Sequence, residues 1–167
     1  MDFVALKKAK VLLNKGNLMS FKLSKRSITR LQGVNKDLVD VVNRAINITE
    51  IDFGVSEGLR TIEKQRELVE KGASQTLKSK HLTGNAVDLV AYIGSKVCWE
   101  LSVYDEIADA MRQSAEELDV ELRWGAAWHK NLTDSGMSAE DLMNEYIDLR
   151  RSQDRRPFID APHFEIV

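Results

Sequence analysis

The sequence is poor in several residue types, and each shortage excludes a class of protein. It has 167 residues and one cysteine, Cys98, so an internal disulfide is excluded and nothing requires an oxidising compartment. Two prolines, nine glycines and the lack of repeats or low-complexity segments are typical of an ordinary globular domain. No apolar run is long enough to span a bilayer, and the first ten residues lack the continuous apolar core of a secretory signal. We therefore expect a protein without stable membrane insertion that accumulates in the cytosol of the cell that makes it.

Neither sign of charge dominates the whole chain, but the charge is unevenly distributed. The formal net charge is −2, whereas residues 1–44 hold ten basic and three acidic residues, giving +7, so the remainder carries −9. A basic segment favours an anionic polymer such as cell wall, lipid headgroups or nucleic acid, or is only a solvated surface. Phe3 and Phe21 are its only aromatic residues, too few for base stacking, so nucleic acid is not expected as a partner.

Hydrophobic periodicity predicts an α+β fold in which a small antiparallel sheet packs with helices. Helices are expected, with Asn35, Thr61 and Ser138 as N-caps, at about 1–16, 38–46, 62–71, 95–118 and 138–149. Alternating or short apolar runs predict strands at 51–55, 86–92, 120–124 and 163–167. The polar segment 73–80 is expected to be a loop.

Only three histidines are present, and two of them lie in motifs that could meet at one metal ion. His81, Asp88 and His163 supply two imidazoles and a carboxylate, which is a three-ligand zinc site with one position left for water. Asp160, three residues before His163, is placed to act as a general base and then as a general acid without binding the ion. From the separations alone, a purely structural role for these side chains is the more common outcome.

The complete motifs resemble those of a known family. Ser-x-His-x-x-Gly-x-Ala-x-Asp at 79–88, followed by acid-x-x-His at 160–163, is similar to the zinc D,D-carboxypeptidase and L-alanyl-D-glutamate peptidase family of cell-wall enzymes. The resemblance covers about residues 21–167 and includes 31–45, 56–65 and the run from Trp124 to Trp128. It is strongest to the phage endolysins that cut the L-alanyl–D-glutamate bond of peptidoglycan stem peptides.

The resemblance implies that His81, Asp88 and His163 bind one zinc ion and that Asp160 is the general base and acid. It also implies that Arg60 stabilises the oxyanion or holds a substrate carboxylate. The alternative for Arg60 is a surface ion pair with Glu57 or Glu63.

Three further residues are expected to support this site. Ser79 orients His81, contacts the substrate or only stabilises its loop. Trp128 is expected to contribute to substrate binding. Glu165 lies two residues after His163 in a strand, therefore on the same face, and is expected to support His163 without binding the ion.

The chain departs from the family pattern at three places. Ala126 stands where the family has the second glycine of a Trp-Gly-Gly-x-Trp run. The connection 129–157 is longer than usual and is expected to add a helix beside the active-site cleft, within a single domain at 21–167. His129 is expected at the surface rather than as a ligand. Residues 1–20 precede the similar part and are expected to form a basic helical extension.

Three functions remain open at this point. The leading one is a monomeric zinc endopeptidase that cuts peptidoglycan stem peptides for host lysis. It would wait in the host cytoplasm until a separate pore-forming protein releases it. The second is a D-alanyl-D-alanine carboxypeptidase of the same family, which would normally need export. The third is a non-catalytic, zinc-stabilised wall-binding module, which would have no use for Asp160.

Overall fold

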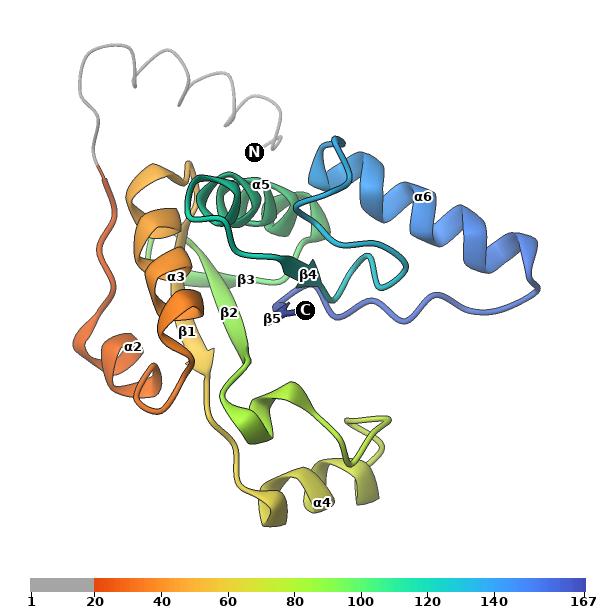
Figure 1. Cartoon of the computed structure of the whole chain (residues 1–167), viewed down its shortest axis with the longest axis horizontal. Helices are drawn as coiled ribbons and strands as arrows, with labels where there is room; N and C mark the ends of the chain where they lie inside the picture. The colour runs from red at the N-terminus through yellow and green to blue at the C-terminus, as the bar shows by residue number, and fades with distance from the viewer. Residues whose placement is uncertain (1–19) are drawn as a thin grey trace.

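The computed structural model describes residues 20–167 as an α+β domain, which confirms the predicted fold class (Figure 1). The helices are α2 (Lys25–Arg30), α3 (Lys36–Ile48), α4 (Ile62–Glu70), the 3-10 helix η1 (Lys80–Thr83), α5 (Leu101–Glu117) and α6 (Ala139–Ser152). The strands are β1 (Asp52–Glu57), β2 (Ala86–Ile93), β3 (Lys96–Cys98), β4 (Leu122–Trp124) and β5 (His163–Ile166). The helix predicted at 1–16 lies outside the described residues, as does all of the predicted extension except Ser20.

The sheet is antiparallel, with strand order β1-β2-β5-β4 and the short β3 paired to β2. The last residues of the chain are thereby inserted between β2 and β4. In this register Asp88 of β2 lies opposite His163 of β5, and Arg123 of β4 lies opposite Glu165. Opposed residues of antiparallel strands project from the same face, and so do residues two apart. The register therefore brings all four side chains to one face of the sheet.

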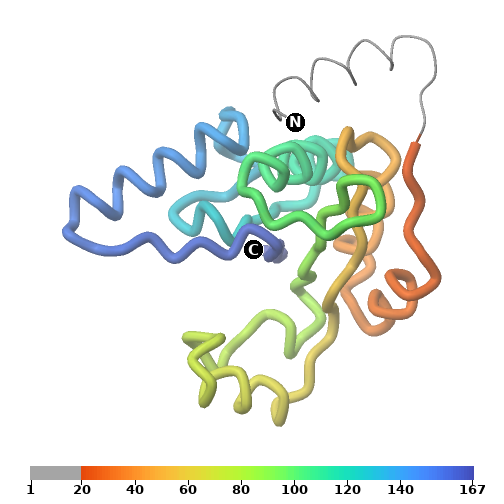
Figure 2. The backbone as a smooth tube through the Cα atoms, turned by 180° about the vertical axis from the view of Figure 1, so that it is seen from behind, coloured from red at the N-terminus to blue at the C-terminus, as the bar shows by residue number. Residues whose placement is uncertain are grey.

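The other face of the sheet forms the core. Val87, Leu89 and Phe164 alternate with the polar residues of β2 and β5 and are fully buried. They belong to one hydrophobic cluster with residues of α3 and α5, such as Val41 and Ile107. Figures 1 and 2 show α3 and α5 together at one side of the sheet, with α4 and α6 extending from other parts of it. The polar face is left for the functional side chains.

The prediction of a helix at 95–118 is wrong for its first residues. β2 instead turns back through Gly94 and Ser95, Gly94 has a φ of +62°, and Ile93 pairs with Lys96 of β3. A two-residue loop that begins with glycine is a β-hairpin signal, because a positive φ matches the twist of the paired strands. Helix α5 begins only at Leu101.

The predicted N-caps are confirmed, and two short helices, α2 and η1, were not predicted. The side chains of Asn35, Thr61 and Ser138 each accept a hydrogen bond from a backbone N–H in the first turn of α3, α4 and α6. Ser24 caps α2 in the same way by accepting from the N–H of Ser27. Six residues are too few to show a helical hydrophobic period, which explains why α2 was missed.

The segment predicted as an inserted helix, 129–157, contains α6. Its residues Leu142, Met143 and Tyr146 are buried and α6 packs on α5, whereas Leu149, about one turn after Tyr146, is exposed. That the segment is an insertion relative to the family stays a prediction. Across residues 20–167, no helix combines the length and apolar character that crossing a bilayer requires.

Candidate metal centre

Local structure places the first predicted ligand, His81, at one edge of a cavity. His81 lies in η1, where Ser79 is the N-cap and its hydroxyl accepts a hydrogen bond from the N–H of His81 (3.3 Å). Gly84 ends η1 with a φ of +72°, and a Cβ there would lie 2.4 Å from the carbonyl oxygen of Gly33. Only glycine fits this turn, which leads the chain directly into β2 and Asp88.

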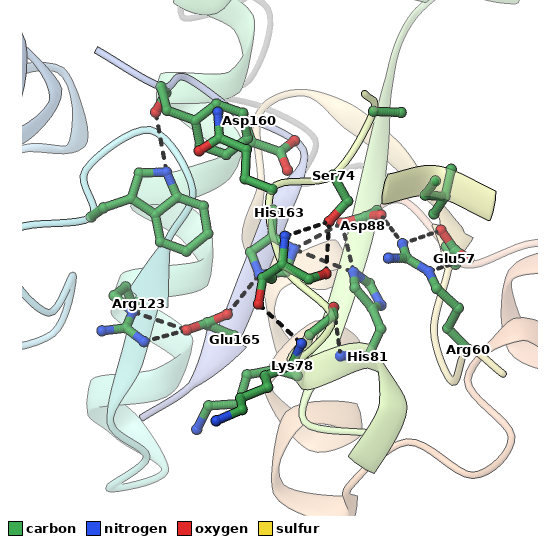
Figure 3. Close-up of a pocket in the computed structure, with 18 residues that line it drawn as sticks. Glu57, Arg60, Ser74, Lys78, His81, Asp88, Arg123, Asp160, His163 and Glu165 are labelled. Carbon is green, nitrogen blue, oxygen red and sulfur yellow. Dashed lines mark hydrogen bonds and ion pairs between the residues drawn. The ribbon is translucent and has the colours of Figure 1, made fainter. Parts of the chain in front are cut away.

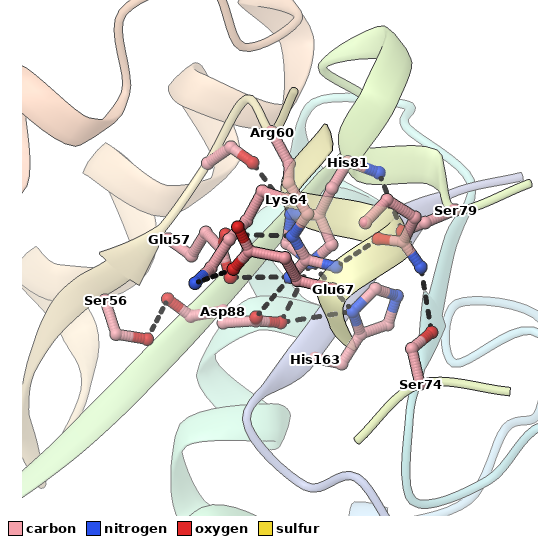
Figure 4. Close-up of polar contacts among 12 residues, drawn as sticks. Ser56, Glu57, Arg60, Lys64, Glu67, Ser74, Ser79, His81, Asp88 and His163 are labelled. Atoms are coloured by element: carbon pink, nitrogen blue, oxygen red, sulfur yellow. Dashed lines mark hydrogen bonds and ion pairs between the residues drawn. The ribbon is translucent and has the colours of Figure 1, made fainter. Parts of the chain in front are cut away.

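The three predicted ligands converge on one point (Figures 3 and 4). Asp88 Oδ1 lies 3.1 Å from His81 Nε2 and 3.1 Å from His163 Nδ1, and these two nitrogens are 3.2 Å apart. Two nitrogens each about 2.05 Å from a tetrahedral zinc ion would be about 3.3 Å apart. The spacing of the donor atoms therefore fits a zinc-sized ion.

The hydrogen bonds on the far sides of the rings assign the tautomers. His81 Nδ1 lies 2.7 Å from the carbonyl oxygen of Gly58, and His163 Nε2 lies 2.8 Å from Glu165 Oε2. Both partners are acceptors, so these ring nitrogens carry the hydrogens. When both rings are neutral, the lone pairs of the other two nitrogens face each other and the Asp88 carboxylate, and the two histidines are only 1% and 6% exposed. Such an arrangement repels itself unless a cation lies between the donors, so the residues fit a bound metal.

The electrostatics of the centre also favour a cation. Burial raises the pKa of Asp88, but hydrogen bonds from His163 and His81 outweigh it and hold the pKa of this carboxyl below its ordinary value. Burial lowers the pKa of His163, yet hydrogen bonds to Asp88 and Glu165 raise it to about 9. The carboxylates thus draw a positive charge to the centre, and a divalent ion there would replace the proton on His163.

Glu165 lies against His163, and a residue that was not predicted holds it there. Its Oε1 accepts hydrogen bonds from Arg123 Nε (2.9 Å) and from a second guanidinium nitrogen, while Oε2 faces His163. Glu165 is 5% exposed, so the ion pair compensates a buried charge. The cross-strand pairing of β4 with β5 creates this contact, and no local motif around Arg123 signals it.

Arg60 makes the ion pair with Glu57 that was predicted as its alternative role, but the pair lies at the cavity wall and the Arg60 side chain is not at the surface. Its guanidinium contacts both carboxylate oxygens of Glu57 and donates to Gln65 Oε1 at 2.7 Å. The same guanidinium lies 3.5 Å from Asp88 Oδ2, and the side chain is 8% exposed. Three of its five N–H groups donate to protein acceptors and a carboxylate of Asp88 lies nearby, which leaves little capacity for a substrate carboxylate.

Asp160 and Trp128 line the same cavity, which has a volume of about 480 Å³. Within residues 20–167 the Asp160 carboxylate has neither a hydrogen bond nor an ion pair, and burial and the charge of Asp88 raise its pKa. The Trp128 ring lies 5.4 Å from that of His163, stacks on Phe158 and donates from Nε1 to the Phe158 carbonyl oxygen. His129 is not part of the centre, because its Nε2 contacts Glu145.

Gly125 fixes the position of Asp160 and His163. Its carbonyl oxygen accepts from the N–H of Asp160 and its N–H donates to the His163 carbonyl oxygen, both at 2.8 Å. A Cβ at this position would lie 2.2 Å from the Asp160 carbonyl oxygen and 2.9 Å from His163 Cβ.

We expect Gly125→Ala to destabilise the fold by about 1–3 kcal/mol, because backbone atoms must move to admit the methyl group. Urea unfolding followed by tryptophan fluorescence measures the loss. An unchanged unfolding midpoint would show that the 160–163 turn tolerates the displacement.

Comparison with known proteins agrees with this geometry. A family model described as phage L-alanyl-D-glutamate peptidase matches residues 19–167. The chain belongs to the phage L-alanyl-D-glutamate peptidase family. The predicted family and the predicted peptidase activity are thereby confirmed.

Individual relatives of this peptidase carry the same description. This chain is 36% identical over 115 residues to an L-alanyl-D-glutamate peptidase of Escherichia phage T5, and the match covers 66% of this chain and 84% of that protein. It is 35% identical over 78 residues to one of Listeria phage A118, covering 47% of this chain and 27% of that protein. The crystal structure of the Serratia marcescens L-Ala D-Glu endopeptidase ChiX matches with a TM-score of 0.67 and 35% identity, over 90% of this chain and 93% of that one.

Proposed function

We propose that this peptidase is a zinc-dependent endopeptidase that hydrolyses the L-alanyl–D-glutamate bond of peptidoglycan stem peptides and lyses the host cell. The observation that carries the proposal is the meeting of His81 Nε2, Asp88 Oδ1 and His163 Nδ1, with the other ring nitrogen of each histidine facing an acceptor. We further propose that residues 21–167 form one catalytic domain and residues 1–20 an extension to it.

The side chains at the cavity have different roles in the proposed hydrolysis. A zinc ion held by the three ligands would lower the pKa of a water molecule and polarise the peptide carbonyl. Asp160 would accept a proton from the attacking water on a carboxylate oxygen and pass it to the leaving amine of D-glutamate. Its lack of a protein partner and its raised pKa suit both transfers.

Arg60 contributes positive charge beside the reacting carbonyl. It lies next to Asp88 at the cavity wall and, because it is held by Glu57 and Gln65, keeps its position as negative charge develops on the substrate oxygen. Trp128 forms an apolar wall for the stem peptide. Ser79 acts on His81 through its loop.

We expect Glu165→Gln to lower zinc affinity about 10–100-fold, because the charged acceptor of the His163 Nε2–H is lost. Competition with a zinc-sensitive dye measures the affinity. Glu121→Gln, which changes an exposed carboxylate just before β4, is the matched control and should bind zinc as the wild type does. Equal zinc affinity of the two variants would show that Glu165 does not support metal binding.

Digestion of purified peptidoglycan tests the function. The wild type with zinc should release fragments that begin with D-glutamate, identified by mass spectrometry. Free D-alanine would instead indicate a carboxypeptidase. Zinc binding without any new amino terminus would indicate a wall-binding module.

The cellular part of the proposal concerns timing. A monomer that waits in the host cytoplasm needs a pore-forming protein to reach the wall. Expression in a bacterial host should therefore cause lysis only when such a protein is co-expressed. Rapid lysis by the peptidase alone would contradict this dependence.

A further inference from the structure

The cavity at the metal centre is lined by four basic side chains, and they differ in whether a carboxylate already neutralises them. They are Arg60, Lys78, Lys80 and Arg123. Arg60 is held by Glu57 and lies beside Asp88, and Arg123 is held by the buried Glu165. Both arginine charges are therefore balanced within the protein.

The charges of the two lysines are not balanced by a carboxylate of the part of the protein that the structure describes. Within residues 20–167, neither Lys78 nor Lys80 makes an ion pair, although both line the cavity. They flank Ser79 on the segment that leads to His81, and Figure 3 labels Lys78 among the cavity residues. Among the four basic side chains of the cavity, these two are the ones that no ion pair within residues 20–167 holds.

The loop that carries the lysines is held in place by a buried side chain. Gln65 of α4 is fully buried, accepts from Arg60, and donates to Ser74 Oγ (2.8 Å) and to the Thr76 carbonyl oxygen (2.5 Å). Thr76 Oγ1 in turn accepts from the N–H of Lys78 at 3.0 Å. The backbone of Lys78 is thus tied to Gln65 by hydrogen bonds, and Lys80 lies in η1 next to His81, so both positions are preorganised beside the metal centre.

The substrate supplies a matching anion next to the bond that is cut. In an L-alanyl–D-glutamate bond the leaving amine belongs to glutamate, which has two carboxyl groups. A peptide that continues beyond glutamate uses one of them, so the other remains as a free carboxylate close to the scissile nitrogen. A carboxylate at this place needs a cation that no protein acidic group already occupies.

We propose that Lys78 and Lys80 bind the free carboxylate of the D-glutamate residue that follows the scissile bond. This inference rests on the proposed function. It assigns to the loop lysines the carboxylate contact that the sequence alone had offered to Arg60.

Two synthetic stem peptides test the assignment. They are identical except that D-glutamate carries a free carboxylate in one and a carboxamide in the other. The wild type should cleave the carboxylate peptide with a kcat/KM about tenfold higher, as expected for a charge-assisted contact at a half-exposed site. The double variant Lys78→Met, Lys80→Met should lose this preference. Each single variant should lose part of it.

Matched controls separate charge from general effects. Lys96→Met removes an exposed lysine from β3, outside the cavity, and should keep the tenfold preference. The double variant Lys78→Arg, Lys80→Arg should restore most of it.

The outcomes separate this inference from the proposed function. A double methionine variant that keeps the full preference, or a wild type that cleaves both peptides equally, would overturn the role of the lysines and leave the peptidase activity intact. A wild type that cleaves neither peptide would overturn the proposed function itself, and this inference with it.

Discussion

Replacement of Asp160 by asparagine should lower kcat by about 10²–10⁴-fold and leave zinc binding unchanged. The carboxamide has the size of the carboxylate but cannot accept a proton from water. Asp160 has no protein partner within residues 20–167 and its side chain is not among the converging donor atoms, so the substitution should disturb neither the fold nor the metal centre. Hydrolysis of a stem peptide and the zinc content of the purified protein measure the two effects.

The two measurements must be read together. A variant that binds one zinc ion and unfolds like the wild type but cannot hydrolyse the peptide assigns proton transfer to Asp160. A variant that retains more than a tenth of the wild-type kcat would mean that another group is the base.

Loss of the metal should abolish activity entirely. Exhaustive chelation should reduce hydrolysis to background and added zinc should restore it, because the proposed reaction depends on an ion held by His81, Asp88 and His163. His81→Ala should have the same effect without rescue, since it leaves one imidazole and one carboxylate to hold the ion.

The third histidine is the matched control for this experiment. His129→Gln changes an imidazole that contacts Glu145 rather than the metal centre, so full zinc binding and activity are expected. Activity that persists after chelation, or a loss in His129→Gln as large as in His81→Ala, would contradict the metal mechanism.

The meeting of His81, Asp88 and His163 could be predicted because the motifs that contain them resemble those of a known family. His81 and Asp88 lie within eight residues of sequence, and a strand beginning at His163 was recognised from its apolar alternation. Only the pairing register of the two strands was missing from the prediction. The structure places Asp88 directly opposite His163 in the antiparallel pair of β2 and β5.

Residues that depend on long-range contacts could not be predicted. Arg123 meets Glu165 only because β4 and β5 pair, and Gln65 meets the 74–78 loop only because α4 folds over it. The role of Arg60 also depended on contacts that spacing does not reveal, because Glu57 was one of two equivalent alternatives. The β2–β3 hairpin was missed for a different reason: the apolar residues after Ser95 were assigned to a helix, and the Gly94–Ser95 turn signal was outweighed.

The most direct test of the account is a crystal structure of the protein grown with zinc, with diffraction recorded on both sides of the zinc absorption edge. We expect one anomalous peak about 2.0–2.1 Å from His81 Nε2 and His163 Nδ1 and about 2.0–2.2 Å from an Asp88 oxygen, with Asp160 near the open position. No peak, or a peak that these three side chains do not reach, would contradict it.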